Sequence, residues 1–142
     1  MELFRSFQIS GSALTAEKLR IDVVAGNLAN MQTTRTAAGG AYRRKTVVFS
    51  TRLDRAVSQV PPAFRGRGVQ VAALVEDPHP PRQEYDPEHP DADEQGFVAY
   101  PNIDLAKEMT DLITASRAYE ANTTAVNTAK SLYLKALEIG RG

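Results

Sequence analysis

The most suggestive chemistry in the sequence lies in the acidic segment DADEQGFVAYPN, which begins like a calcium-binding loop. Loop positions one, three, five and six are filled by Asp91, Asp93, Gln95 and Gly96. Position twelve requires a glutamate that binds the ion through both oxygens, but Asn102 stands there. Because aspartate and glycine are also common turn residues, we interpret the segment as an acidic β-turn and predict no metal site.

The two histidines lie in proline-flanked segments, DPHPP around His79 and EHPD around His89. An imidazole beside carboxylates can bind a metal or act as a base. Neither histidine has a second ligand at helical or strand spacing, so we predict exposed loop side chains. No nucleophile with its base and no pair of catalytic carboxylates is present either. We therefore predict no enzymatic activity, no cofactor and no small-molecule substrate.

Opposite charges are separated along a chain whose net charge is zero. Residues 31–75 hold eight basic side chains and one acidic one, whereas residues 76–104 hold nine acidic and one basic. The run YRRK at 42–45, with aromatic residues nearby, could contact nucleic acid. The adjoining acidic segment instead favours charge pairing within the chain or between subunits, and we predict no nucleic-acid partner.

The length of 142 residues suits one domain, and the absence of cysteine excludes disulfide bonds and thiolate metal sites. No apolar run approaches the roughly 20 residues of a membrane-spanning helix. The N-terminus does not resemble a cleavable signal peptide, because Glu2 and Arg5 flank its only short apolar stretch. We expect any route out of the cytoplasm to use a different signal.

The N-terminal segment has the apolar spacing of a helix that packs along one narrow stripe. Large apolar residues recur every seven positions, at Phe7, Leu14, Ile21 and Leu28. The sequence therefore predicts a helix over residues 1–31.

The C-terminal segment shows the same repeat more strongly and predicts a helix over residues 103–139. It has no internal glycine or proline, so the helix would be roughly 55 Å long. Asn102 is the expected capping residue, and Gly140 follows the expected end. A polar Asn122 among the repeating residues would favour one register between paired helices. The repeating residues are Leu105, Leu112, Tyr119, Val126 and Tyr133.

The middle of the chain is interrupted by glycine and proline clusters and cannot form a long helix. Three short runs favour strands: YRRKTVVF at 42–49, GVQVAALV at 68–75 and FVAY at 97–100. We interpret them as a small antiparallel β element with long loops.

These patterns together predict an α+β fold with two parts. Residues 1–31 and 103–142 form long helices that pair as an antiparallel-type coiled coil, and residues 32–102 form a small β-rich outer domain with long loops. Each apolar stripe is too narrow for a globular core, so the helices pair with each other or with neighbouring subunits. Periodicity alone does not separate this arrangement from a self-contained helical hairpin packed on the sheet.

Four separated segments resemble the rod and hook proteins of the bacterial flagellum, in particular those of the proximal rod. They are SALTAEKLRIDVVAGNLANMQTTR, YRRKTVVF, YDPEHPDADEQGFVAYPN and EMTDLITASRAYEANTTAVNTAKSLYLKALEIG. They stand in the family's order, and only residues 46–84 are generic. The resemblance implies terminal helices in the inner layer of a helical tube, with the β-rich part outside.

Carried over residue by residue, the resemblance assigns packing roles to both helices. It matches Leu14, Ile21, Asn27, Leu28 and Asn30 in the N-terminal motif, and Met109, Leu112, Ser116, Arg117, Tyr119, Glu120, Asn122 and Asn127 in the C-terminal motif. With the repeating residues added, the expected subunit-packing set is Phe7, Leu14, Ile21, Asn27, Leu28, Asn30, Leu105, Met109, Leu112, Ser116, Tyr119, Asn122, Val126 and Tyr133.

The resemblance implies a structural subunit of the proximal rod, which packs into a tube that transmits torque and surrounds the export channel. Its expected partners are copies of itself, other rod proteins, the flagellar type III export apparatus and the basal-body ring. The expected location is the rod in the periplasm, reached without signal cleavage. The alternative function is a soluble adaptor or export chaperone that captures partner helices.

Two residues weaken the N-terminal helix where it should be strongest. Related sequences often have Asn or Ser in place of Gly26, and a glycine inside a helix costs roughly 1 kcal/mol relative to alanine. Asn27 adds a polar side chain beside the apolar stripe. We hypothesise that a subunit exported unfolded defers the stability of its terminal helices to assembly.

Overall fold

The computed structural model describes residues 2–53 and 66–140 and has an α+β fold. Residues 1, 54–65, 141 and 142 lie outside this part, and with them part of the basic segment and the last two residues of the expected helical core. The elements are α1 (Glu2–Ala29), β1 (Lys45–Leu53), β2 (Gly66–Glu76), β3 (Arg82–Tyr85), β4 (Phe97–Tyr100) and α2 (Leu105–Ile139). The expectation of two long terminal helices with small antiparallel sheets between them is confirmed.

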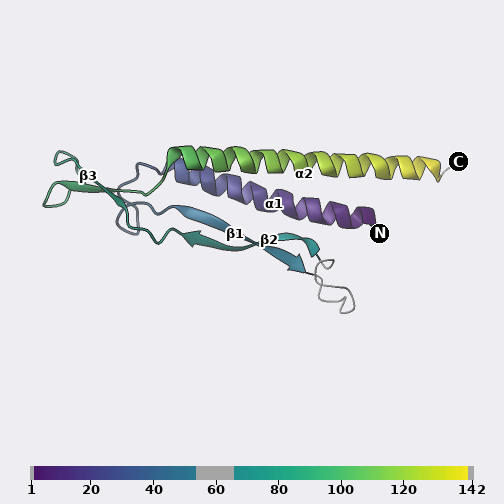
Figure 1. Cartoon of the computed structure of the whole chain (residues 1–142), viewed down its shortest axis with the longest axis horizontal. Coiled ribbons are helices and arrows are strands. Elements are labelled where there is room, and N and C mark those ends of the chain that lie inside the picture. The colour runs from purple at the N-terminus through teal and green to yellow at the C-terminus, as the bar shows by residue number, and fades with distance from the viewer. Residues whose placement is uncertain (1, 54–65, 141–142) are drawn as a thin grey trace.

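The two helices lie side by side and run in opposite directions (Figure 1). Near the start of α1 the ring of Phe4 meets the ring of Tyr133 edge-on, with centroids 6.0 Å apart. Near its end the side chain of Asn27 meets Glu108, in the first turn of α2. Because α2 has 35 residues and α1 has 28, the C-terminal end of α2 extends beyond the start of α1.

The ends of the helices differ by a few residues from the sequence-based expectation. α1 ends at Ala29, two residues before the predicted limit. The N-cap of α2 is Asp104, whose carboxylate accepts hydrogen bonds from the backbone N–H groups of Ala106 (2.9 Å) and Lys107 (3.3 Å). The prediction that Asn102 caps this helix was therefore wrong. The predicted end is confirmed, because Gly140 is the C-cap.

The β structure consists of two separate two-stranded antiparallel sheets, β1 with β2 and β3 with β4. β2 extends beyond the predicted run at both ends, and β4 lies where it was predicted. The run predicted at 42–49 was misplaced, because β1 begins only at Lys45 and continues to Leu53. β3, with the sequence RQEY, was not predicted, because its four side chains are all exposed and show no apolar alternation. Its strand conformation depends on pairing with β4.

The core is thin and runs along the helices. α1 lies between α2 and the β1–β2 hairpin, so the molecule has three narrow layers (Figure 1). Among the described residues, five apolar side chains are buried besides Pro101, and three of them are alanines, which allow close approach of the elements but bury little area. They are Ala16, Val24, Val98, Ala115 and Ala129.

Gly68 allows the hairpin to sit directly on α1. Its φ of +114° is unfavourable for other residues, and a Cβ at this position would lie 2.0 Å from Oγ of Ser12 and 3.3 Å from Cα of Ile9. The same Ser12 hydroxyl accepts a hydrogen bond from the N–H of Val69 at 3.0 Å. The contact between β2 and α1 thus requires a residue without a side chain at this point.

We expect Gly68→Ala to lower the free energy of unfolding by about 3 kcal/mol, because it combines an unfavourable φ with a steric clash. Gly66→Ala, at a position with open space, is the matched control and should change stability by less than about 1 kcal/mol. Urea unfolding followed by circular dichroism measures both. Equal effects of the two substitutions would show that the hairpin does not depend on this close approach.

Candidate functional site

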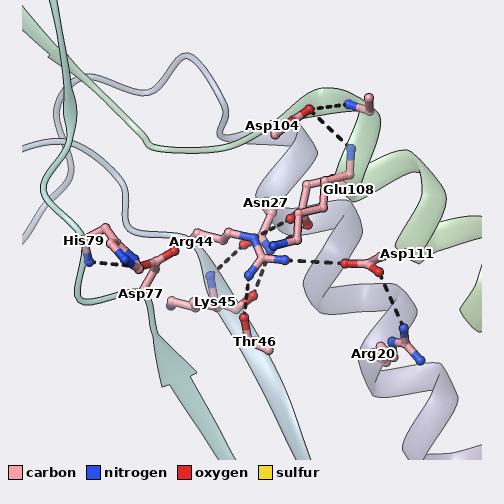
Figure 2. A network of polar contacts seen from close by, with 12 residues as sticks. Arg20, Asn27, Arg44, Lys45, Thr46, Asp77, His79, Asp104, Glu108 and Asp111 are labelled. Carbon is pink, nitrogen blue, oxygen red and sulfur yellow. Dashed lines mark hydrogen bonds and ion pairs between the residues drawn. The ribbon is translucent and has the colours of Figure 1, made fainter.

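Three polar residues from different parts of the chain meet where the helices join the hairpin (Figure 2). We call Asn27, Arg44 and Glu108 the polar junction; they come from the end of α1, the residue before β1 and the first turn of α2. The side chains of Asn27 and Glu108 are 0% exposed, and that of Arg44 is 14% exposed. Buried groups of this kind are stable only when their hydrogen bonds are satisfied.

Asn27 uses the full hydrogen-bonding capacity of its side chain. Its amide donates to the carbonyl of Lys45 (2.8 Å) and to Oε2 of Glu108 (3.0 Å). Its oxygen accepts from the N–H of Lys45 (2.9 Å) and the hydroxyl of Tyr42 (3.2 Å). The amide therefore pairs with both backbone groups of Lys45, as a neighbouring strand would, and joins α1 to β1 and α2 at once.

Glu108 and Arg44 form the charged half of the junction. Oε1 of Glu108 accepts a hydrogen bond from Nε of Arg44 at 2.5 Å, while Oε2 accepts from Asn27. The remaining guanidinium nitrogens reach the hydroxyl of Thr46 (2.8 Å) and a carboxylate oxygen of Asp111 (3.5 Å). Removing water from two charges is costly, so removal of one partner would leave the other uncompensated.

The charge network continues along the helices with weaker contacts. Asp111 lies 3.8 Å from Arg20 of α1, and Arg20 lies 3.7 Å from Glu17, one turn earlier. Asp111 and Arg20 retain about a third of their side-chain exposure, so these ion pairs contribute little to stability. Strong coupling between the helices is therefore concentrated in the polar junction.

Asn30 and Gly26, two further residues near the end of α1 that do not favour a helix, differ in what the structure shows of them. The amide of Asn30 donates to the carbonyl of Gly26 (2.9 Å), and its oxygen accepts from the hydroxyl of Thr33 (3.1 Å), so Asn30 helps to end the helix. A Cβ on Gly26 would meet open space. Nothing in the structure explains the glycine at that position.

The acidic segment forms a turn whose aspartates accept hydrogen bonds from the turn's own backbone and from the segment that follows α1. Oδ1 of Asp93 accepts from the N–H groups of Gln95 and Phe97, both at 2.9 Å. Asp91 accepts from the hydroxyl of Thr34 (2.8 Å) and lies 3.6 Å from Arg35. No cluster of three or more His, Asp or Glu side chains suited to a metal ion occurs in residues 2–53 and 66–140.

The two histidines have different environments. His79 is exposed, as predicted, and contacts Asp77, with its backbone N–H and ring holding the pKa of that carboxyl below its usual value. The prediction of an exposed His89 was wrong, because it is half-buried. Its Nδ1 accepts from the N–H of Asp91 (3.0 Å), and its ring meets Tyr100 edge-on. Local hydrogen bonding accounts for both side chains.

Comparison with known proteins places this architecture in a family. The family model described as "Flagella basal body rod protein" matches residues 7–35, and "Flagellar basal body rod FlgEFG protein C-terminal" matches residues 94–139. The flagellar basal-body rod protein FlgC of Bacillus subtilis is 45% identical, covering 99% of this chain and 100% of its own length. FlgC of Borreliella burgdorferi is 43% identical with 100% coverage of both, and FlgC of Escherichia coli is 43% identical with 99% and 100% coverage.

The chain belongs to the FlgC family. As a FlgC-family member it is a structural protein of the flagellar basal-body rod and not an enzyme, and the adaptor or chaperone alternative is not favoured. Asn27 and Glu108 fall within the two segments matched by the family models, whereas Arg44 falls between them. In the described part of this FlgC-family chain, no helix is both long and apolar enough to cross a membrane.

The structure places the expected packing residues of the FlgC-family chain in three environments, although it does not test their role. Asn27 is buried. The half-buried residues are Phe7, Leu14, Ile21, Leu28, Asn30, Leu112, Ser116, Asn122 and Val126, and the exposed ones are Leu105, Met109, Tyr119 and Tyr133.

Sequence reasoning missed Arg44 and Glu108 as members of the site. A signal for Glu108 was present in the sequence. Glu108 lies three residues after Leu105, just as Ala115 lies three residues after Leu112, and a charged side chain is unexpected at this position of the repeat. Asn122, expected to favour one register, donates instead to the carbonyl of Ala118 in its own helix at 2.8 Å. No periodic signal marks Arg44.

We expect Asn27→Leu to lower the free energy of unfolding by about 3–5 kcal/mol. The leucine keeps the approximate volume but leaves the backbone groups of Lys45 and one oxygen of Glu108 without a partner. Asn122→Leu, which removes only a bond within its own helix, should cost less than about 1 kcal/mol. Urea unfolding measures the difference, and a cost for Asn27→Leu no larger than the control would contradict the structural role of the junction.

Tyr42 should make the stability of the folded chain fall at alkaline pH. Burial, followed by the charges of Glu76 and Glu108, raises the pKa of its hydroxyl above the ordinary value of about 10. The resulting stabilisation is present below about pH 10 and is lost as the pH rises through the folded-state pKa, because ionisation removes the hydrogen donated to Asn27.

The test compares thermal unfolding between about pH 9 and 12. Tyr42→Phe should show a smaller fall in melting temperature than the wild type, whereas Tyr85→Phe, at an exposed position, should follow the wild-type curve. If the Tyr42→Phe curve is parallel to that of the wild type, Tyr42 does not contribute to the alkaline loss.

Proposed function

We propose that the chain is a subunit of the proximal rod that packs, with copies of itself and other rod proteins, into a helical tube that transmits torque and surrounds the export channel. One observation carries this proposal: α2 keeps many large apolar side chains exposed although it already packs against α1. Such a helix surface normally has a protein partner. These side chains are Leu105, Met109, Ile113, Leu132, Leu134, Leu137 and Ile139.

The exposed apolar residues suggest two contacts with neighbouring subunits. One lies near the start of α2, where Leu105, Met109 and Ile113 follow each other at four-residue spacing on one face. The other lies at the end of α2, beyond the position where Tyr133 meets α1. Both ends of the longest helix would then contact other helices in the tube.

We assign the expected packing residues to two kinds of contact. The half-buried apolar members pack between α1 and α2 of one chain in coiled-coil fashion. Of the exposed members, Leu105, Met109 and Tyr119 contact neighbours, whereas Tyr133 packs on Phe4 of the same chain. Residues 1–31 and 103–142 would form the inner helical part of the rod, and residues 32–102 the outer part.

The proposal extends to delivery and location. The chain would leave the cytoplasm through the flagellar type III export apparatus without signal cleavage and assemble in the periplasm next to the basal-body ring. The thin, alanine-rich core supports this, because a chain that buries little apolar area is easier to unfold for export.

We expect Met109→Asp and Tyr119→Asp to abolish swimming in cells that lack their own copy of the protein. Each places an unpaired charge at a contact between subunits, where it would be desolvated. Met109 is 50% exposed in the chain alone, so its substitution should leave the thermal unfolding of the purified protein unchanged. Met109→Leu is the matched apolar control and should swim.

Isolated basal bodies provide the second readout. The wild type and Met109→Leu should be present in them, and Met109→Asp should be absent. A motile Met109→Asp strain with the variant protein in its basal bodies would contradict the proposed contact. Absence of the wild-type protein from basal bodies would contradict the rod function itself and favour a chaperone.

A further inference from the structure

We infer that the polar junction, and not the apolar contact between the helices, sets the axial register of α2 on α1. The inference concerns the folded chain alone and holds whatever the chain assembles with. It rests on two arguments from the structure: the apolar contact would tolerate more than one register, and the geometry of the junction would tolerate only one.

The apolar contact repeats itself along both helices. On α1 the large residues recur every seven positions from Phe7 to Leu28. On α2 the same repeat includes Leu112 and Val126, which are half-buried, and Tyr133, which packs on Phe4. A slip of seven residues, about 10 Å along the axis, would therefore set apolar residues against apolar residues again. The residues buried between the helices are largely alanines, such as Ala115 and Ala129, whose small side chains do not interlock strongly enough to prevent it.

The polar junction cannot be satisfied after such a slip. Asn27 is fully hydrogen-bonded only when Glu108 lies opposite it, and each carboxylate oxygen of Glu108 has its own partner. A slip in one direction would place Ala115 against Asn27, and a slip in the other would place Pro101 there. In either case Glu108 would lose both of its partners, and Arg44, whose side chain is 14% exposed, would lose the carboxylate that neutralises it, which is strongly unfavourable.

The remaining contacts between the helices do not fix the register as firmly. Arg20 and Asp111 lie 3.8 Å apart and are partly exposed, so they can exchange partners with water. Phe4 and Tyr133 pack edge-on, and Val126, one repeat before Tyr133, could take the place of that tyrosine against Phe4. Asn122 donates within its own helix. The polar junction is thus the register-determining contact.

The test measures the distance between spin labels in the full chain by pulsed electron spin resonance. Because the chain has no cysteine, Asp22→Cys and Lys130→Cys provide the only two labelling sites, both at exposed positions. A seven-residue slip should change the distance between the labels by roughly 8–10 Å. We expect a single distance in the otherwise wild-type chain.

The first variant replaces the junction with apolar residues of similar size: Asn27→Leu, Arg44→Met and Glu108→Leu together. We expect retained helical circular dichroism and a second distance shifted by that amount. A single unchanged distance would overturn the inference. So would loss of the helical signal, because the inference requires the apolar contact to hold the helices together without the junction. Leu112→Ala, which weakens only the apolar contact, should keep the single distance.

The second variant moves the carboxylate by one repeat, with Glu108→Ala and Ala115→Glu in the same chain. We expect the label distance to shorten by roughly 8 Å, because α2 must slide towards its own N-terminus to bring the relocated carboxylate to Asn27 and Arg44. The original distance in this variant would overturn the inference, since it would place a buried charge without partners in an unchanged register.

Discussion

The fold depends on a buried carboxylate and a buried amide that complete each other's hydrogen bonds. Glu108 and Asn27 come from opposite ends of the sequence, and both are fully removed from water. Arg44 neutralises the carboxylate, and Lys45 pairs its backbone with the amide, so the start of the hairpin is fixed at the same point. Unless all of these partners are in place, the buried polar groups lose their hydrogen bonds to water without gaining others, and the fold is destabilised.

This concentration of polar contacts is understandable in a molecule with so thin a core. Its alanines allow the helices to approach closely but give little steric preference for one arrangement over another. The apolar residues left exposed on α2 are those a rod subunit can use for its neighbours. If the rod subunit packs as proposed, specificity within the chain and attraction between chains are carried by different side chains.

Local sequence patterns were sufficient to predict both helices and the strand β4. The seven-residue spacing predicted both helices, and the run FVAY predicted β4. β3 was missed because its four exposed residues become a strand only by pairing with β4. Arg44 and Glu108 were missed for a related reason: they are 64 residues apart in sequence, and their roles arise only when the folded chain brings them together. The cap at Asp104 was misplaced by two residues, since Asn102 is an equally good capping residue by type.

The pairing of Asn27 with Lys45 has a further consequence for the hairpin. Both backbone groups of the first residue of β1 point away from β2 towards α1, where a bare strand edge would otherwise begin. An open edge of this kind is a template on which strands of other molecules can add and aggregate. The side chain of Asn27 shields this edge, so the folded chain offers one site fewer at which a strand of another molecule could add.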